Sequence, residues 1–218
     1  MNNLLVVIPA LNEEKSIGNL LSKIIPQFNT LVVSDGSIDK TVEISEFHGA
    51  KVLSFKNHQG YDKVINKGFF YAAENGYKKV ITFDADGQHE VKDLHKIARL
   101  MDDENIDIVV PQRTNITRLS EKLFSWYTKR QINVPDLLSG MKGYKTDLFL
   151  KYGAFDTFSS IGTELSFFAI KKRFNYKLIE ITMNKREDKP RFGGLLMPNI
   201  KIIRALAILM YRNLLNKI

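Results

Sequence analysis

LLVVIPALNEEKSIGNLLSKI (4–24) is the stretch that decides the fold. It opens with the apolar run Leu4–Ile8, which is typical of a buried strand, and Pro9 is expected to end that strand. Asn12 is the predicted N-cap of a helix, because Glu13 and Glu14 follow it and carboxylates favour the positive end of a helix. The apolar residues behind it share one helical face: Ile17, Leu20, Leu21 and Ile24. A buried strand followed by an amphipathic helix is the first half of a β–α–β unit.

The same alternation continues through the first half of the chain. Further strands are predicted over residues 30–34, 52–55, 80–83 and 106–110, and further helices over residues 39–47, 62–74 and 91–101. Strands that alternate with helices predict an α/β fold, with a mainly parallel central sheet flanked by helices. After Pro111 the alternation stops, and we predict helices near residues 119–130, 165–172 and 199–217 and an extended segment at 178–183.

The domain organisation predicted from the sequence is simple. No repeat, low-complexity segment or Gly/Ser-rich linker divides residues 1–194, so we predict one domain there and a C-terminal helical segment over residues 195–218. That segment mixes Ile, Leu and Met with charged residues that are all basic: Lys201, Arg204, Arg212 and Lys217. Such a basic amphipathic helix suits a membrane interface near anionic lipid, and a helix packed on the domain or at a dimer contact is the alternative.

Composition excludes several classes of site and of protein. The 218 residues include no cysteine, which excludes disulfides, thiolate nucleophiles and Cys-ligated zinc or iron–sulfur centres. No apolar run approaches the ~18–20 residues of a membrane span, and the first residues lack the pattern of a signal peptide, so we expect none. Lys and Arg number 32 against 24 Asp and Glu, a net charge of +8 that indicates an anionic partner: phosphate groups, nucleic acid or a lipid surface.

Polar side chains follow each predicted strand. Asp35-Gly36-Ser37 follows the second strand, the cluster at residues 57–60 follows the third, and Gln112 and Arg113 follow the fifth. In open α/β sheets, ligands bind beyond the carboxyl ends of the strands. The strand ends are therefore the predicted binding edge. Two interpretations of Asp35 remain open. Its carboxylate can receive hydrogen bonds from a nucleotide, or the residue can belong to a simple strand-to-helix turn.

The cluster DADGQH (84–89) after the fourth strand carries the most chemistry. Asp84 and Asp86 stand where a buried strand turns into a loop, so both carboxylates can converge on one hard divalent cation, with the Gln88 side chain as a further oxygen ligand. An Asp-Gly turn with local hydrogen bonds is the alternative, but the neighbouring strand-end clusters favour the metal.

With these segments in order, the chain resembles a family 2 glycosyltransferase of the GT-A fold. Within the family it looks most like the branch of dolichyl-phosphate mannose synthases, which transfer sugars to polyprenyl phosphates. The matching stretches are VVIPALNEEKSIG (6–18), VVSDGSIDKT (32–41), ITFDADGQHEVKDL (81–94), DLLSGMKGYKTDLF (136–149) and ELSFFAIKKRFNYKLIEITMNKRE (164–187). Their order and spacing together make the resemblance specific.

The resemblance implies a role for each matching position. Pro9, Ala10, Asn12 and Glu13 would line the nucleotide site, and Asp35 would contact the nucleobase or ribose. Asp84 would lie near the donor, while Asp86 and Gln88 would hold Mg²⁺ or Mn²⁺ on the diphosphate. The residues around the phosphates would be Arg113, Ser139, Arg186 and Arg191.

The reaction implied is inverting transfer of a sugar from a UDP- or GDP-sugar to a polyprenyl phosphate, by a peripheral protein on the cytoplasmic membrane face. The alternative is transfer to a glycan hydroxyl in polysaccharide synthesis. A hydroxyl must lose its proton, and Glu164 is then the candidate base. Glu164 is equally consistent with a solvated residue that opens a helix. Asp84, Asp86, Arg113 and Glu164 are thus the candidate catalytic residues.

The chain departs from the family pattern at several positions. One acidic residue, in Ser34-Asp35, stands where the family often has two, and Asp62 stands in place of a glycine. Met141-Lys142 replaces Phe-Arg, and the ending common in the family is only loosely echoed at residues 191–194. These departures bear on the sugar and the acceptor rather than on the fold.

Two other classes of protein fit the sequence less well. A nucleotidyltransferase would carry a Gly-rich, Lys-containing phosphate loop after the first strand, whereas residues 10–14 are acidic. A nucleic-acid-binding module would show interleaved aromatic and basic residues, and the acidic strand ends would repel a phosphate backbone. We therefore expect no nucleic-acid partner.

Overall fold

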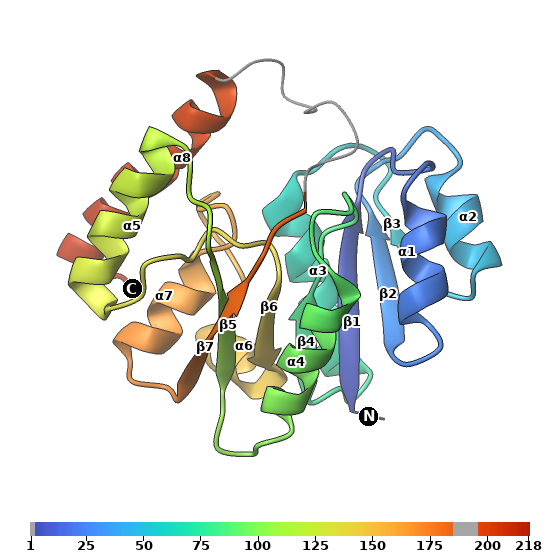
Figure 1. Ribbon diagram of the computed structural model, residues 1–218, viewed down its shortest axis with the longest axis horizontal. Coiled ribbons are helices and arrows are strands. Elements are labelled where there is room, and N and C mark those ends of the chain that lie inside the picture. The colour runs from blue at the N-terminus through green and yellow to red at the C-terminus, as the bar shows by residue number, and fades with distance from the viewer. Residues whose placement is uncertain (1–2, 185–195) are drawn as a thin grey trace.

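The computed structural model describes residues 3–184 and 196–218 and shows a seven-stranded mixed sheet with helices on both faces (Figure 1). The strand order is β3-β2-β1-β4-β6-β5-β7. All neighbouring strands pair in parallel except β6, which runs antiparallel to both β4 and β5. The predicted α/β fold with a mainly parallel sheet is confirmed.

The elements follow one another with short connections. The strands are β1 (Leu4–Ala10), β2 (Asn29–Ser34), β3 (Lys51–Ser54), β4 (Lys79–Thr82), β5 (Ile108–Arg113), β6 (Lys142–Lys145) and β7 (Tyr176–Ile181). The helices are α1 (Ile17–Ile24), α2 (Thr41–Phe47), α3 (Tyr61–Glu74), α4 (Val91–Met101), α5 (Leu119–Ile132), α6 (Thr146–Tyr152), α7 (Glu164–Lys171) and α8 (Leu196–Leu214).

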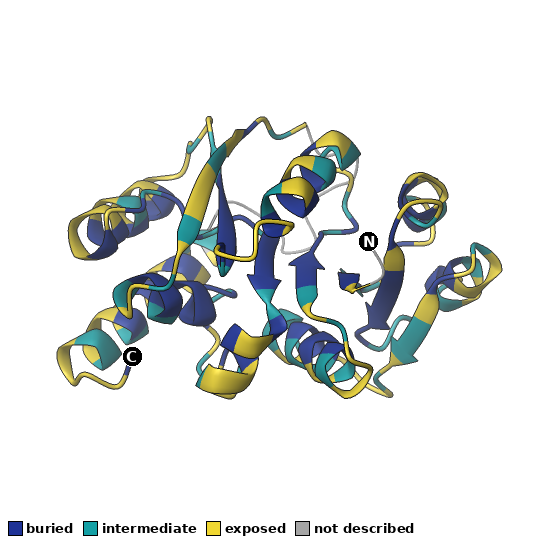
Figure 2. Ribbon diagram, turned by 90° about the horizontal axis from the view of Figure 1, so that it is seen from below, coloured by how far each residue is buried: buried dark blue, intermediate teal, exposed yellow. Residues whose placement is uncertain are grey.

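The sheet separates two apolar cores, because successive side chains of a strand point to opposite faces. In β1, Leu4, Val6 and Ile8 pack with α1 and α4, whereas Leu5 and Val7 pack with α3 on the other face. Figure 2 shows the buried strands between helices whose outward sides are exposed. The second core also receives apolar side chains of α5, α6, α7 and α8.

The topology fixes where a ligand site can form. From β1 the chain proceeds through α1 to β2, and from β4 it proceeds through α4 toward β5 on the opposite side of the sheet. The loops after these two neighbouring parallel strands therefore diverge and leave a crevice at their carboxyl ends. Both the segment after Ala10 and the segment that begins at Asp84 border this switch point.

Several element boundaries differ from those predicted from the sequence. β1 continues through Pro9 to Ala10, in parallel register with β2. Asn12 is not a helix N-cap, because its backbone is left-handed (φ 52°) and α1 begins only at Ile17. β5 starts two residues later than expected and includes Gln112 and Arg113. The short elements β6 and α6 were not predicted.

The C-terminal helix α8 packs on the domain with one side only. Ile202, Ala205, Leu206 and Leu209 are buried in the core shared with α5 and α7. The predicted boundary between residues 194 and 195 lies outside the described residues. Within the part of the chain that the structure describes, no helix is long and apolar enough to span a membrane.

Candidate active site

A pocket of about 210 Å³ lies at the carboxyl ends of β1, β2 and β4. It brings together six of the residues singled out from the sequence: Pro9, Ala10, Glu13, Asp35, Asp84 and Asp86. Leu11, His58, Tyr61, Val64 and Ala85 complete its wall. Segments far apart in the sequence thus meet where the strand order predicts a ligand. Its lining combines apolar side chains with the four carboxylates of Glu13, Asp35, Asp84 and Asp86.

Asp35 closes one side of the pocket by holding the loop before α3. Its carboxylate accepts hydrogen bonds from the backbone N–H groups of Gln59 (2.6 Å) and Gly60 (3.0 Å), and pairs with His58 Nδ1 at 2.7 Å. His58 itself is more than half exposed. Asp35 therefore fixes the position of the loop that forms this side of the pocket. His58 is the polar side chain of that loop that lines the pocket.

Asn12 lies outside this pocket, unlike the other predicted nucleotide-site residues. Its Oδ1 accepts a hydrogen bond from Ile38 N (2.9 Å), and its own N–H donates to Ser37 Oγ (3.1 Å). Glu13 N donates in parallel to Thr41 Oγ1 (2.7 Å). Asn12 thus joins the β1–α1 loop to the β2–α2 loop, which sets the shape of the rim.

Asp84 and Asp86 follow β4 directly and reach the pocket from the same loop. Asp86 Oδ1 accepts the backbone N–H of Gln88 (3.1 Å), so the loop turns around this carboxylate. Among the described residues, no three His, Cys, Asp or Glu side chains converge to form a complete metal cage. The Gln88 side chain is not on the pocket wall, but the two carboxylates still fit a hard divalent ion that keeps waters and substrate oxygens as its other ligands.

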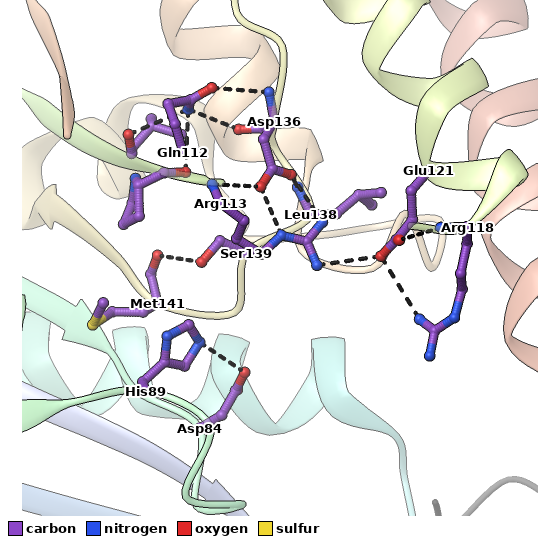
Figure 3. Close-up of polar contacts among 12 residues, drawn as sticks. Asp84, His89, Gln112, Arg113, Arg118, Glu121, Asp136, Leu138, Ser139 and Met141 are labelled. Atoms are coloured by element: carbon purple, nitrogen blue, oxygen red, sulfur yellow. Dashed lines mark hydrogen bonds and ion pairs between the residues drawn. The ribbon is translucent and has the colours of Figure 1, made fainter. Parts of the chain in front are cut away.

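His89 belongs to the same loop, and the sequence gives only a weak signal for it. Its imidazole is buried against the Phe83 ring, and neither ring nitrogen has a hydrogen-bond partner within the described part of the chain. Nε2 lies 3.6 Å from Asp84 Oδ2, beyond hydrogen-bond length (Figure 3). An unpaired buried nitrogen beside a carboxylate is costly. It is the second observation, besides the carboxylate pair, that fits an ion at this corner.

The segment before β6 forms the surface on which Asp84 rests. A Cβ added to Gly140 would lie 1.9 Å from Asp84 Oδ2, so only glycine leaves room for this carboxylate. Gly140 O also accepts hydrogen bonds from Thr82 Oγ1 (2.7 Å) and Tyr61 OH (3.4 Å). The orientation of Asp84 therefore depends on a segment more than fifty residues away.

Arg113 anchors that segment instead of facing the pocket. Its guanidinium donates to both carboxylate oxygens of Asp136 (2.7 and 3.0 Å) and to Glu121 Oε1 (3.2 Å), as Figure 3 shows. Gln112 grips the backbone of Asp136 from the other side, accepting its N–H and donating to its carbonyl, both at 3.0 Å. Arg113 is not on the pocket wall and its guanidinium is engaged by two carboxylates, so its contact with phosphate stays a prediction.

Ser139, another predicted phosphate contact, is not on the pocket wall. Ser139 is buried, and its hydroxyl donates to the carbonyl of Met141 at 3.3 Å within its own loop. Its contact with phosphate also stays a prediction. Arg186 and Arg191 lie outside the described residues.

Glu164 is the first residue of α7 and is completely buried, so the interpretation as a solvated residue is wrong. Its carboxylate accepts hydrogen bonds from Tyr152 OH (2.5 Å) and Thr157 Oγ1 (2.8 Å), and Arg212 of α8 lies 3.8 Å away. Burial raises the pKa of Glu164 above its usual value. It does not line the pocket, which separates it from the reacting groups expected there.

Asp62 and Lys142 hold the loop before α7. Asp62 Oδ1 accepts the N–H of Gly162 (2.9 Å), and Lys142 Nζ donates to the carbonyl of the same residue (2.9 Å). Burial, with the nearby charge of Asp156, raises the pKa of Asp62 to about 7. Burial lowers the pKa of Lys142 to about 8. Burial thus disfavours the charged form of both side chains.

Asp62→Asn is expected to change how stability depends on pH. Because the folded pKa of Asp62 lies above its unfolded value, its contribution to stability is complete below pH ~4 and is lost as the pH rises toward 7. The variant keeps an acceptor for Gly162 but has no charge to bury. Its free energy of unfolding relative to wild type should rise between pH 5 and 7, by at most about 1.4 kcal/mol per pH unit. Urea denaturation at several pH values measures this.

Asp39→Asn is the control for that experiment. Burial acts to raise the pKa of Asp39, but hydrogen bonds from Thr41 and Glu14 outweigh it and the pKa is lowered. The contribution of Asp39 is therefore complete by pH ~5, and its variant should differ from wild type by a constant amount above that pH. A flat difference for Asp62→Asn as well would contradict the raised pKa.

A larger hollow of about 570 Å³ lies at the opposite edge of the sheet, at the amino ends of β5 and β7. Asp103, Asn105, Arg173 and Lys177 line it together with apolar residues. It contains no pair of carboxylates and lies away from the switch point, so the pocket at Asp84 and Asp86 is the candidate active site.

Several known proteins are similar to this chain in sequence. An uncharacterized protein of Methanocaldococcus jannaschii is 38% identical over 114 residues, which cover 51% of this chain and 47% of that protein. The chain thus spans about half the length of this relative. The undecaprenyl-phosphate mannosyltransferase of Micrococcus luteus is 25% identical over 166 residues, 66% of each chain. 

Among solved structures, glucosyl-3-phosphoglycerate synthase of Mycobacterium tuberculosis, in complex with Mg²⁺ and uridine diphosphate, superposes with a TM-score of 0.75 at 19% identity. This superposition covers 96% of this chain and 79% of that chain. The likeness confirms the predicted GT-A fold. The family model for glycosyl transferase family 2 matches residues 5–174, from the first strand through α7. The chain therefore belongs to glycosyl transferase family 2.

Proposed function

We propose that the chain transfers a sugar, with inversion, from a UDP- or GDP-sugar to the phosphate of a polyprenyl phosphate. The main support for a nucleotide-sugar donor is the pocket itself. Its lining combines apolar side chains with the carboxylates of Asp84 and Asp86, at the switch point of the sheet. A nucleoside fits the first feature and a metal-bound diphosphate the second.

Asp84 and Asp86, with the amide of Gln88, are the residues that would hold Mg²⁺ or Mn²⁺. Such an ion supplies positive charge to the leaving diphosphate, whose negative charge grows as the sugar departs. Pro9, Ala10, Glu13 and the wall built by Asp35 would orient the nucleoside. Arg113 and Gln112 would act through Asp136, by fixing the segment against which Asp84 rests.

The acceptor is the less constrained half of the proposal. A lipid phosphate is already anionic and needs positioning rather than a base, whereas a glycan hydroxyl needs a general base. Glu164, the candidate base, is buried among Tyr152, Thr157 and Arg212 and does not line the pocket. This favours the lipid phosphate over the glycan. The undecaprenyl-phosphate mannosyltransferase among the relatives supports the same choice.

Radiolabelled UDP- and GDP-sugars test the proposal when each is incubated with Mn²⁺ and either a polyprenyl phosphate or an oligosaccharide. We expect label in an organic-soluble product that mild acid releases, as a glycosyl phosphodiester should. Label in the oligosaccharide alone would refute the lipid acceptor and leave the donor assignment standing. A polyprenyl phosphate resides in a bilayer, so the proposal includes peripheral association with the cytoplasmic membrane face.

A further inference from the structure

The outer side of α8 is unusually apolar for a surface helix. Ile200, Ile203, Met210, Tyr211 and Leu214 are 43–80% exposed. At their spacing they form one stripe along the helix, on the side opposite the buried residues Ile202, Ala205 and Leu209. The stripe runs most of the length of α8. Contiguous exposed apolar patches of this kind mark interaction sites.

α5 carries a matching stripe. Leu119, Leu123 and Trp126 are 81, 45 and 59% exposed and follow one another at the i, i+4, i+7 spacing of one helical face. Elsewhere around the helix, Phe124 and Tyr127 are buried in the same core that receives α8. The outward faces of both helices therefore point away from a common core.

The two helices lie side by side, so their stripes form one surface. Asn213 of α8 donates hydrogen bonds to Tyr127 OH (2.9 Å) and Gln131 Oε1 (3.1 Å) of α5, and Ser120 bonds Asn199 near the other end. Figure 1 shows α5 and α8 together as an outer layer at one end of the molecule. We call this surface, formed by the exposed residues of α5 and α8, the α5–α8 face.

The charges on the α5–α8 face have a single sign. Lys122, Lys129 and Arg130 of α5 and Lys201 and Arg204 of α8 are exposed. α8 contains no acidic residue, and the one acidic residue of α5, Glu121, is buried and paired with Arg113. A second copy of the chain would set basic side chains against basic side chains. An anionic lipid surface complements both the apolar stripe and the basic residues.

We propose that the α5–α8 face lies flat on an anionic bilayer, with its apolar side chains at the level of the lipid headgroups. The inference deepens the proposed function, because it names the surface that would bring the enzyme to a lipid acceptor. It rests on that function only in this respect, since binding to vesicles requires no sugar transfer. It also adds α5, with its tryptophan, to the C-terminal helix as membrane-contacting structure.

Trp126 is the only tryptophan of the chain, so its fluorescence reports on the α5–α8 face alone. Vesicles of phosphatidylcholine with added phosphatidylglycerol should shift its emission to the blue, protect it from iodide and allow quenching by brominated acyl chains. The protein should cosediment with these vesicles and not with pure phosphatidylcholine. An unchanged emission with both kinds of vesicle, or equal binding to both, would overturn the proposal.

Variants identify the surface that binds. Ile203→Glu should reduce the vesicle partition coefficient more than tenfold, whereas Ile38→Glu, at a 92% exposed position in the β2–α2 loop, should leave it unchanged. Lys129→Gln should weaken binding about fivefold, and Lys23→Gln of α1 should not. Equal losses in the control variants would overturn the assignment to this face, and so would a stable dimer in light scattering that shields Trp126 without lipid.

The failure of this inference is distinguishable from failure of the proposed function. Asp86→Ala should bind vesicles like wild type, because the site and the α5–α8 face are separate surfaces. A protein that binds anionic vesicles and labels only oligosaccharides would keep the inference and refute the acceptor. A protein that labels polyprenyl phosphate in detergent without binding vesicles would do the reverse.

Discussion

Asp86→Ala is expected to abolish the part of nucleotide binding that depends on a divalent ion. With wild type, UDP or GDP alone should raise the melting temperature weakly, and addition of Mn²⁺ should raise it further. In the variant the second increment should disappear, because one of the two carboxylates at the end of β4 is gone. Sugar transfer should fall by about 10³-fold, since metal stabilisation of a leaving group is worth several kcal/mol.

Asp147→Ala is the matched control for that variant. Asp147 is an exposed aspartate in the first turn of α6, away from the pocket. Its removal should leave both increments in melting temperature and the rate of transfer near wild-type values. A Mn²⁺ increment that survives in Asp86→Ala would mean that the ion binds elsewhere, and the assignment of Asp86 as a metal ligand would fall.

Gly140→Ala is expected to inactivate the enzyme with little loss of stability. The new methyl group would lie 1.9 Å from Asp84 Oδ2, much closer than two nonbonded atoms can approach. Asp84 is partly exposed, so its side chain can turn away, and the carboxylate pair is then lost. We expect transfer to fall at least 100-fold and Mn²⁺ affinity to fall with it, as calorimetric titration with the metal and nucleotide would measure.

Gly68→Ala gives the contrasting result. Its methyl group would meet Val7 Cγ1 at 2.4 Å inside the core, so it overpacks the sheet instead of the site. Such overpacking costs about 1–3 kcal/mol, partly offset by the roughly 1 kcal/mol that alanine gains over glycine in a helix. Gly68→Ala should lower stability and preserve Mn²⁺ affinity. If Gly140→Ala instead lost stability and kept its metal, the close contact with Asp84 would have no functional meaning.

Much of the sheet could be predicted from the sequence, because its parallel strands are continuous apolar runs. β6 was missed for a physical reason. Its residues Lys142–Lys145 form no apolar run, and they become a strand only because β4 and β5 offer backbone partners on both sides. Asn12 was misjudged because its left-handed backbone is stabilised by partners on another loop, Ser37 and Ile38.

Site residues that directly follow a strand could be predicted from the sequence. Site residues whose role depends on packing between distant segments could not. Asp35, Asp84 and Asp86 reach the pocket because their positions follow from the strand pattern. The partners of Arg113 lie 8 and 23 residues along the chain, so the sequence could not show that its charge is used internally. His89 likewise becomes notable only once its burial without a partner is seen.

The reversed direction of β6 has a consequence for how the site can vary. Since Lys142 pairs with Thr82, the chain enters β6 at the rim where the parallel strands end and leaves it at the far rim, beside Lys79. The segment that precedes β6, residues 136–141, therefore borders the candidate active site. At the parallel strands, by contrast, it is the segment following the strand that borders the site. An insertion before Lys142 would change the shape of the candidate active site. An insertion after Lys145 would change only the opposite end of the sheet.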